Sequence, residues 1–165
     1  MKKVAKFEKV TYEQFNKDYN NIYLKDYSLE DYNNIQLPTR ATTGSAGYDF
    51  FMPFNLNVEP NDSIIIPTGI RCKIDDGYVL KIYPRSSLGF KFRMSLANTV
   101  GIIDADYYNA LNQGHIMIKV CNNSNNVLEL KKDTGFCQGL FIEYFITYDD
   151  ECENIRTGGL GSTTK

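Results

Sequence analysis

Short β-forming segments separated by turn residues recur along the chain from Leu37 onward, and this spacing constrains the fold more than any other feature. The segments include IRCKI, YVLKIY, HIMIKV, VLELKK and FCQGLFIEYFI. Glycine, proline, asparagine and aspartate lie between them, as they do in turns. Strands that begin about every eight to twelve residues are typical of packed antiparallel sheets rather than alternating βα units. We therefore expect an all-β fold, a sandwich or jelly roll.

The turn residues also predict two hairpins. Asp75-Asp76-Gly77 separates IRCKI from YVLKIY, and the polar run NNSNN at 122–126 separates HIMIKV from VLELKK. In each case we expect the two flanking strands to pair.

The first 36 residues have a different pattern. Thr11 and Gln14 form a capping-box signal before YEQFNKDYNNIYL, which predicts a short helix, and Ser28-x-x-Asp31 is a second, weaker start signal. The segment is rich in tyrosine, and we expect these rings to pack on the body of the protein, with a surface for a protein partner as the alternative. The sequence thus predicts an N-terminal extension over 1–36, a β domain over 37–150 and a flexible C-terminal arm over 151–165.

Composition excludes several classes of protein. A net charge of -2 argues against bulk binding to nucleic acid. No apolar run is long enough to span a membrane, and the first ten residues do not form a signal peptide. Four cysteines without C-x-x-C spacing and a single histidine argue against a zinc site. We expect reduced cysteines and a cytoplasmic protein.

Residues 83–107 carry the chemistry. Pro84-Arg85-Ser86-Ser87-Leu88-Gly89 has the composition of a loop that presents a cation, hydroxyls and N–H groups to an anion. The run GIIDADY at 101–107 places two carboxylates and a tyrosine after an apolar segment. An anion-binding loop close to acids indicates chemistry on a phosphate ester.

Five clusters occur in a fixed order: AGYD at 46–49, PRSSLG at 84–89, NTVGIIDADY at 98–107, GFCQGLF at 135–141 and RTGGLGS at 156–162. Together they resemble the five motifs of the trimeric deoxyuridine triphosphatase (dUTPase) family. The resemblance spans residues 37–165. It implies a dUTPase-type jelly roll that hydrolyses dUTP to dUMP and pyrophosphate, which keeps uracil out of DNA and supplies dUMP.

The resemblance assigns roles around the base and sugar. Asn98 matches the residue that opens a β-hairpin reading uracil, because fixed donors and acceptors leave a wrong base unpaired. Asp104 matches the catalytic carboxylate that activates water for attack on the α-phosphorus. Tyr107 matches the ring that packs under deoxyribose, where a 2′-hydroxyl would clash. Asp106 is expected to be structural and to hydrogen-bond the turn.

The resemblance also assigns the phosphate contacts. Arg85, Ser86 and Gln138 match residues that bind the triphosphate and its leaving group, and Ser87 occupies a neighbouring position. Asp49 is expected to support this region, through Arg85 or through metal-bound water. A Mg²⁺ ion held mainly by triphosphate oxygens is implied, with no direct protein ligand.

The arm resembles the family's lid over the nucleotide, whose substrate-binding residues would be Arg156, Leu160, Gly161, Ser162 and Thr163. Three positions depart from the family pattern. Leu160 replaces the usual phenylalanine that stacks on uracil, at a cost of about 0.5–1.5 kcal/mol. Gly135 stands where arginine is common, and Asn109 where glycine is frequent.

The family's sites combine residues from three chains, so the resemblance implies a homotrimer that binds dUTP. Two alternatives stay open. One is a deaminase of dCTP with the same fold, although such enzymes lack a G-x-I-D-x-D-Y run. The other is a nucleotide-sensing regulator that binds a protein partner through the extension.

Overall fold

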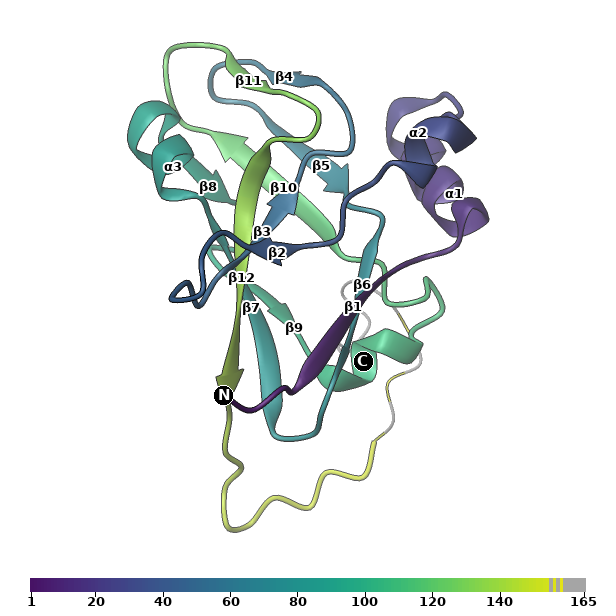
Figure 1. The fold of residues 1–165 in the computed structure, drawn as a ribbon, viewed down its shortest axis with the longest axis vertical. Coiled ribbons are helices and arrows are strands. Elements are labelled where there is room, and N and C mark those ends of the chain that lie inside the picture. Colours follow the sequence, from purple (N-terminus) through teal and green to yellow (C-terminus); the bar gives the residue numbers. More distant parts are fainter. Residues whose placement is uncertain (155, 157, 159–165) are drawn as a thin grey trace.

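The computed structural model describes residues 1–154, 156 and 158, and it is built mainly of antiparallel strands (Figure 1). The all-β prediction is confirmed. In chain order the elements are β1 (Ala5–Lys9), α1 (Tyr12–Tyr23), α2 (Leu29–Asn33), β2 (Thr39–Arg40), β3 (Tyr48–Phe51), β4 (Leu56–Val58), β5 (Ser63–Pro67), β6 (Ile70–Ile74), β7 (Tyr78–Pro84), α3 (Ser86–Phe92), β8 (Met94–Leu96), β9 (Gly101–Ile103), the 3₁₀ helix η1 (Ala105–Asn109), β10 (Met117–Asn122), β11 (Leu128–Leu130) and β12 (Gly135–Glu143).

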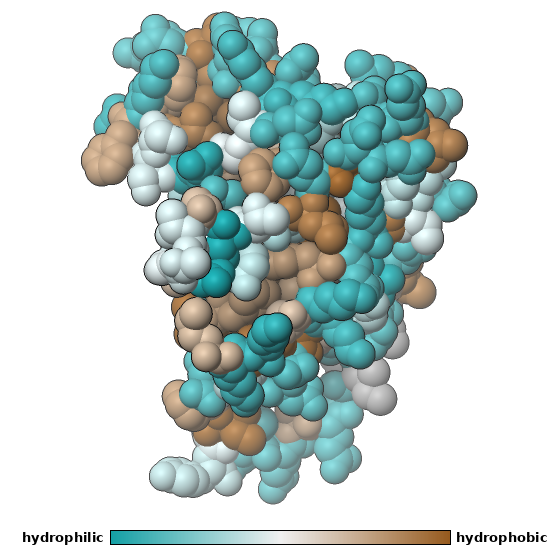
Figure 2. Space-filling view, viewed as in Figure 1, coloured by the Kyte–Doolittle hydropathy of each residue, from teal (hydrophilic) through white to brown (hydrophobic). Residues whose placement is uncertain are grey.

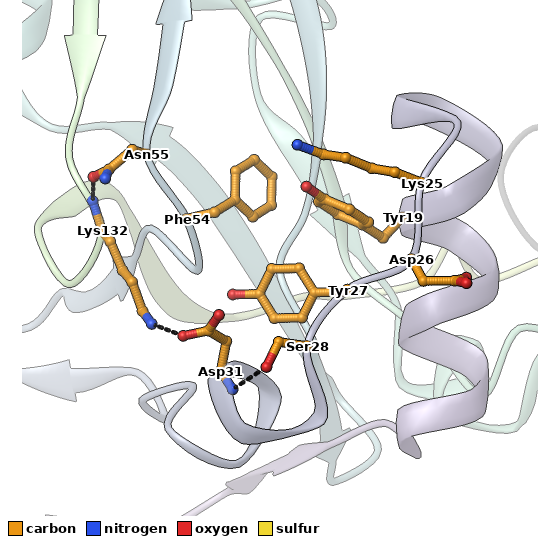
Figure 3. A pocket seen from close by; sticks show the side chains of 9 residues that line it. All are labelled: Tyr19, Lys25, Asp26, Tyr27, Ser28, Asp31, Phe54, Asn55 and Lys132. Atoms are coloured by element: carbon orange, nitrogen blue, oxygen red, sulfur yellow. Dashed lines mark hydrogen bonds and ion pairs between the residues drawn. The ribbon is translucent and has the colours of Figure 1, made fainter.

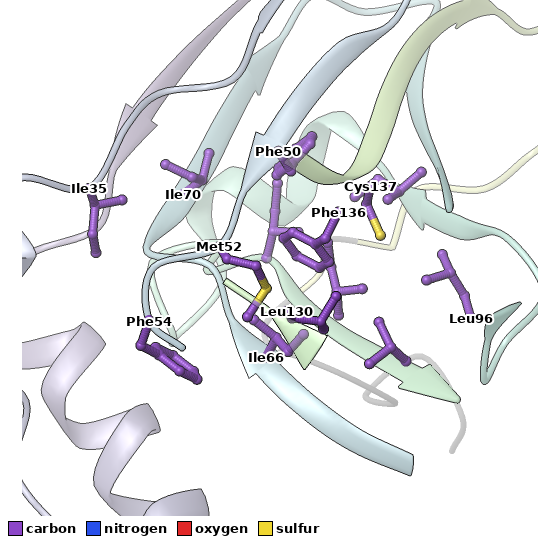
Figure 4. Close-up of a cluster of buried hydrophobic side chains, with 14 of the residues drawn as sticks. Ile35, Phe50, Met52, Phe54, Ile66, Ile70, Leu96, Leu130, Phe136 and Cys137 are labelled. Carbon is purple, nitrogen blue, oxygen red and sulfur yellow. The ribbon is translucent and has the colours of Figure 1, made fainter. Parts of the chain in front are cut away.

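The largest sheet has the strand order β2-β3-β12-β7-β9. Its central strand β12 pairs with β3 on one side and β7 on the other, with Gln138 opposite both Asp49 and Tyr83. A second sheet has the order β5-β10-β8, and β1-β6 and β11-β4 form two-stranded ribbons. These strands enclose the hydrophobic core, in which Phe50, Met52 and Phe136 meet (Figure 4).

Both predicted hairpins are wrong as strand pairs, although both turns exist. Gly77 has a φ of 84°, and the Tyr78 N–H donates to the Asp75 carbonyl at 3.3 Å. The strands then separate, because β6 pairs with β1 whereas β7 pairs with β12 and β9. Likewise β10 belongs to the second sheet and β11 pairs with β4. Turn residues mark where the chain reverses, but burial of each strand's apolar face decides which strand it pairs with.

The N-terminal residues pack against the β domain. Thr11 caps α1 by accepting a hydrogen bond from the Gln14 N–H, and β1 pairs with β6. Tyr19 and Tyr27 are buried beside Phe54 of the β domain, so the expectation that tyrosines pack on the body is confirmed (Figure 3). A cavity of about 480 Å³ lies at this contact, and the Asp31–Lys132 ion pair forms part of its lining.

Within the part of the chain that the structure describes, no helix is both long and apolar enough to cross a membrane.

Candidate functional site

Arg85 lies where β7 ends and α3 begins. Pro84 is the last residue of β7, and Arg85 is the N-cap residue of α3 with extended backbone. The segment PRSSLG was predicted to be a loop, and this is wrong because Ser86 to Phe92 form a helix. Leu88 and Phe92 pack against the core from one face of that helix, which explains its formation.

A cavity of about 600 Å³ brings together the residues that the sequence assigns to phosphate. Its lining includes Asp49, Arg85, Ser86, Ser87 and Gln138. The Arg85 Nε atom is 3.5 Å from Asp49 Oδ1, and Nη1 donates to the Gly135 carbonyl at 3.4 Å. The guanidinium is therefore directed toward β3 and β12 and is still about two-fifths exposed, so it remains available to an anion.

Two glycines leave room for the side-chain ends of Arg85 and Gln138. A Cβ atom on Gly135 would lie 2.6 Å from Arg85 Nη1, and a Cβ on Gly47 would lie 2.7 Å from Gln138 Oε1. Position 135, where arginine is common in the family pattern, carries no side chain here, and the Arg85 guanidinium lies where such a side chain would begin.

Asp104 follows β9 and begins η1, and its side chain is about half exposed. The Arg156 Nη2 atom donates to Asp104 Oδ2 at 2.8 Å, and Nε donates to Asp106 Oδ1 at 2.9 Å. The guanidinium carbon is 5.6 Å from the centre of the Tyr107 ring. Asp106 was expected to bond the turn, but the contact found for its carboxylate is with Arg156 of the arm.

Tyr107 is buried, and its hydroxyl is held on two sides. The hydroxyl donates to the His115 carbonyl at 2.8 Å and accepts from Asn112 Nδ2 at 2.8 Å. Burial raises the pKa of the Tyr107 phenol above its usual value, although the hydrogen bond from Asn112 opposes this. The sequence interpretation missed that Asn112 and His115 hold the Tyr107 hydroxyl. Neither an asparagine nor a single histidine at the start of a strand-forming segment indicates which residues it contacts in the fold.

Asn98 lies in the turn between β8 and β9. Its carbonyl accepts from the Val100 N–H at 2.7 Å, and Thr99 has a φ of 66°. An apolar cavity of about 450 Å³ opens beside it, lined mainly by aliphatic side chains of β5, β7, β9 and β10. A β-hairpin was expected here. The turn is present, but β8 and β9 do not pair with each other, because β8 pairs with β10 and β9 pairs with β7.

The two charged clusters do not meet within one chain. Leu80 pairs with Ile103, so Asp104 lies beside the start of β7 while Arg85 follows its end. At about 3.3 Å per residue, their backbones are about 20 Å apart along the strand. Arg85 also points toward β3 and β12, on the side of β7 away from β9. In Figure 1, α3 and the end of β9 lie at opposite ends of the sheet.

The sequence model of the dUTPase family matches residues 33–164. The chain belongs to the dUTPase family. It is 37% identical over 132 residues to the deoxyuridine 5′-triphosphate nucleotidohydrolase of Lactococcus lactis, which covers 78% of this chain and 88% of that protein. It is also 37% identical over 138 residues to the enzyme of the same name from Paraburkholderia phytofirmans, covering 79% and 90% of the two chains.

Solved dUTPase structures have the same fold. The crystal structure of dUTPase from Streptococcus mutans superposes with a TM-score of 0.66 at 30% identity, covering 86% of this chain and 97% of that chain. A dUTPase from phage phi11 of Staphylococcus aureus, at 20% identity, has a TM-score of 0.60 and covers 73% of this chain and 92% of its own. The jelly-roll prediction is thereby confirmed for this dUTPase.

Four of the predicted lid residues, Leu160, Gly161, Ser162 and Thr163, lie outside the described part of the chain. The segment between β12 and the arm includes Phe145 and Ile146, whose side chains are 86% and 70% exposed. Figure 2 shows hydrophobic and hydrophilic atoms side by side at the lower edge of the molecule.

Proposed function

We propose that this dUTPase hydrolyses dUTP to dUMP and pyrophosphate, with Asp104 as the general base for the attacking water. The observation that carries the proposal is the Asp104 carboxylate at the end of β9, exposed to solvent and next to the buried Tyr107. A positioned carboxylate can accept the proton of water as it attacks the α-phosphorus. The products give the reaction its role, which is to remove dUTP before DNA synthesis and to supply dUMP.

Arg85, Ser86, Ser87 and Gln138 would bind the triphosphate. They share one cavity, and an arginine that is already oriented by a carboxylate at 3.5 Å is suited to bind a phosphate. Charge develops on the departing pyrophosphate, and a fixed guanidinium stabilises it without reorganisation.

Asn98 would select the base, and Tyr107 the sugar. The cavity beside Asn98 is apolar and has polar backbone groups at its turn, which is the combination that binds a flat heterocycle. Tyr107 is buried and its hydroxyl is hydrogen-bonded inside the protein, so its ring would be held in a fixed place beneath deoxyribose.

Arg156 and the lid positions Leu160, Gly161, Ser162 and Thr163 would close over bound nucleotide. Arg156 is held by Asp104 and Asp106 in this structure. The triphosphate, which carries more negative charge, would compete for the same guanidinium and draw the arm over the substrate.

We propose a homotrimer with shared active sites. The separation of Arg85 from Asp104 within one chain supports this, because both must approach the same triphosphate. A neighbouring copy would supply the missing cluster, so that Arg85 of one chain and Asp104 of another meet at one triphosphate.

Mg²⁺ is the proposed cofactor. In the phage phi11 dUTPase a structural Mg(II) ion has been described. Among residues 1–154, 156 and 158, no three His, Cys, Asp or Glu side chains gather as metal ligands, but Asp49 lines the phosphate cavity. This donor set fits a cation bound by triphosphate oxygens, with Asp49 in contact through water. When bound, the ion would neutralise phosphate charge.

The four free cysteines agree with a cytoplasmic location, which we also propose. No observation favours the deaminase or the regulator over the hydrolase. In particular, the tyrosines of the extension that would form a partner surface include Tyr19 and Tyr27, which are buried.

The test is pyrophosphate release by the purified full chain with dUTP, dCTP, dTTP and UTP, together with an assay for ammonia. We expect turnover of dUTP with strong preference over the other three nucleotides. Ammonia from dCTP without pyrophosphate from dUTP would instead identify a deaminase, and the hydrolase proposal would be rejected.

A further inference from the structure

Asp18 of α1 holds the side chain of His115, which is fully buried. His115 Nδ1 is 2.6 Å from Asp18 Oδ2, and Nε2 accepts a hydrogen bond from the Gly69 N–H at 2.8 Å. Because a backbone N–H can only donate, Nε2 carries no proton, and the ring proton must be on Nδ1. His115 therefore donates to the Asp18 carboxylate, and both ring nitrogens are fixed.

His115 also holds Tyr107, through its backbone carbonyl. The His115 carbonyl accepts the Tyr107 hydroxyl at 2.8 Å, and Asn112 Nδ2 donates to that hydroxyl. Asp18 and Tyr107 are thus connected through His115, whose ring bonds Asp18 and whose backbone carbonyl bonds Tyr107, and these contacts form one path. It runs from α1 to the ring that we propose lies under deoxyribose.

A second connection ties α1 to this loop. The Thr11 N–H donates to Gln113 Oε1 at 2.9 Å, and Gln113 Nε2 donates to Thr11 Oγ1 at 3.2 Å. Since Thr11 is also the N-cap of α1, the helix contacts residues 113 and 115 from its first turn and from Asp18.

These contacts come from a part of the chain that precedes the residues matched by the family model. The family model begins at residue 33, whereas Thr11 and Asp18 precede it. His115 is 0% exposed, so it cannot touch a nucleotide, and it acts through its neighbours.

We infer that Asp18 is a positioning residue for Tyr107, and that the N-terminal segment thereby sets the discrimination of dUTP from UTP. This inference rests on the proposed function. A ring held at one position can exclude the added 2′-hydroxyl of UTP, whereas a ring free to shift gives that hydroxyl room.

The test measures kcat/KM for dUTP and for UTP in the full chain. Asp18→Ala removes the carboxylate that accepts from His115, and with it the support of the His115 ring. We expect the ratio of kcat/KM for dUTP to kcat/KM for UTP to fall about 10-fold. This is the lower end of the roughly 10- to 100-fold effects that follow loss of a residue supporting a site. Asp18→Asn keeps an oxygen that accepts from His115 Nδ1 and should retain most of the ratio.

Asp26→Asn is the matched control. Asp26 lies in the same segment and accepts hydrogen bonds from Asn16 and Asn20, but it does not contact the loop that holds Tyr107. The ratio of kcat/KM for dUTP to kcat/KM for UTP in Asp26→Asn should equal that of the wild type. Gln113→Ala removes the Thr11 contacts without altering the buried pair, and it should lower the ratio in the same direction as Asp18→Ala.

Equal losses for both nucleotides in Asp18→Ala would indicate a role in stability alone and overturn the inference. If Asp18→Ala does not fold, an unchanged ratio in Gln113→Ala overturns it. A wild type that does not hydrolyse dUTP rejects the proposed function itself, whereas an active wild type with unchanged ratios in the variants rejects the positioning role alone.

Discussion

Arg156 donates hydrogen bonds to Asp104 at 2.8 Å and to Asp106 at 2.9 Å, so one guanidinium of the arm bridges the two carboxylates that follow β9. These two acids are close in sequence and similarly exposed, but we assign only Asp104 to the attacking water. The pair therefore allows a matched comparison.

Asp104→Asn should lower kcat for dUTP by about 10²–10⁴-fold, because the amide cannot accept a proton from water. Asp106→Asn removes the charge from an equivalent ion pair with Arg156 and should change kcat by less than about 10-fold. Initial rates of pyrophosphate release measure both. Similar losses of kcat in Asp104→Asn and Asp106→Asn would show that both act through their contact with Arg156 of the arm. Asp104 would then not be the general base.

Gly135→Ala should raise KM for dUTP. The new Cβ atom would lie 2.6 Å from Arg85 Nη1, so the guanidinium must move from its place beside Asp49. One weakened charge-assisted hydrogen bond corresponds to about 1.5–3 kcal/mol, a loss of roughly 10-fold or more in kcat/KM.

Gly44→Ala is the control for this change, because a Cβ atom at residue 44 would have no heavy atom within 4 Å. Its KM should be that of the wild type. A normal KM in Gly135→Ala would mean that Arg85 tolerates displacement and does not bind phosphate from its present position.

The fold class and the residue clusters could be predicted from the sequence because both depend on local patterns. Strand-forming segments, turns and the caps at Thr11 and Ser28 all appear where expected. The partners of the strands could not be predicted. Whether β7 pairs with β6 or with β12 depends on burial of faces across the whole core, and no turn sequence encodes that.

The candidate site divides in the same way. The positions of Arg85 and Asp104 along the chain were evident, but their separation follows from the register of β7 and β9. The helix after Arg85 formed because Leu88 and Phe92 face the core, a tertiary effect that overrides the loop-forming composition of PRSSLG. The buried partners of Tyr107 are equally long-range, since Asp18 is far from His115 in sequence.

The stability that Asp18 provides should depend on pH. Burial disfavours the charged carboxylate, but hydrogen bonds from His115 and Gln14 outweigh it, so the pKa of Asp18 is lowered in the folded protein. A lowered pKa contributes stability above the unfolded value, about 3.9, and this contribution is lost as pH falls toward the folded value. Wild type should thus exceed Asp18→Asn in stability at pH 7 and lose that advantage below about pH 4.

Urea unfolding at pH 7, 5, 4 and 3 measures this difference, with Asp26→Asn as the control carboxylate in the same segment. A difference between wild type and Asp18→Asn that is constant across this range would contradict a charged Asp18 in the folded state.

Mg²⁺ should bind to this protein tightly only with nucleotide. The described residues form no group of three or more His, Cys, Asp or Glu ligands, so most ligands of the ion must come from the triphosphate and from water. Titration calorimetry with MgCl₂ should show negligible heat for the free protein and clear binding with a non-hydrolysable dUTP analogue present. Equal Mg²⁺ affinity with and without the analogue would require a site for the ion on the protein itself. In a separate assay, removal of Mg²⁺ by EDTA should lower the rate of pyrophosphate release.

Two inactive variants should restore each other's activity if the site is shared between subunits. Arg85→Ala keeps Asp104, and Asp104→Asn keeps Arg85; these residues are separated within each chain by the length of β7. After the two proteins are mixed at equal concentration, denatured and refolded together, about one quarter of the sites should combine an intact Arg85 with an intact Asp104 from different chains. Pyrophosphate release should recover to about that fraction of wild type. Each variant refolded alone is the control and should stay inactive, and a mixture as inactive as its components would place both residues of a working site on one chain.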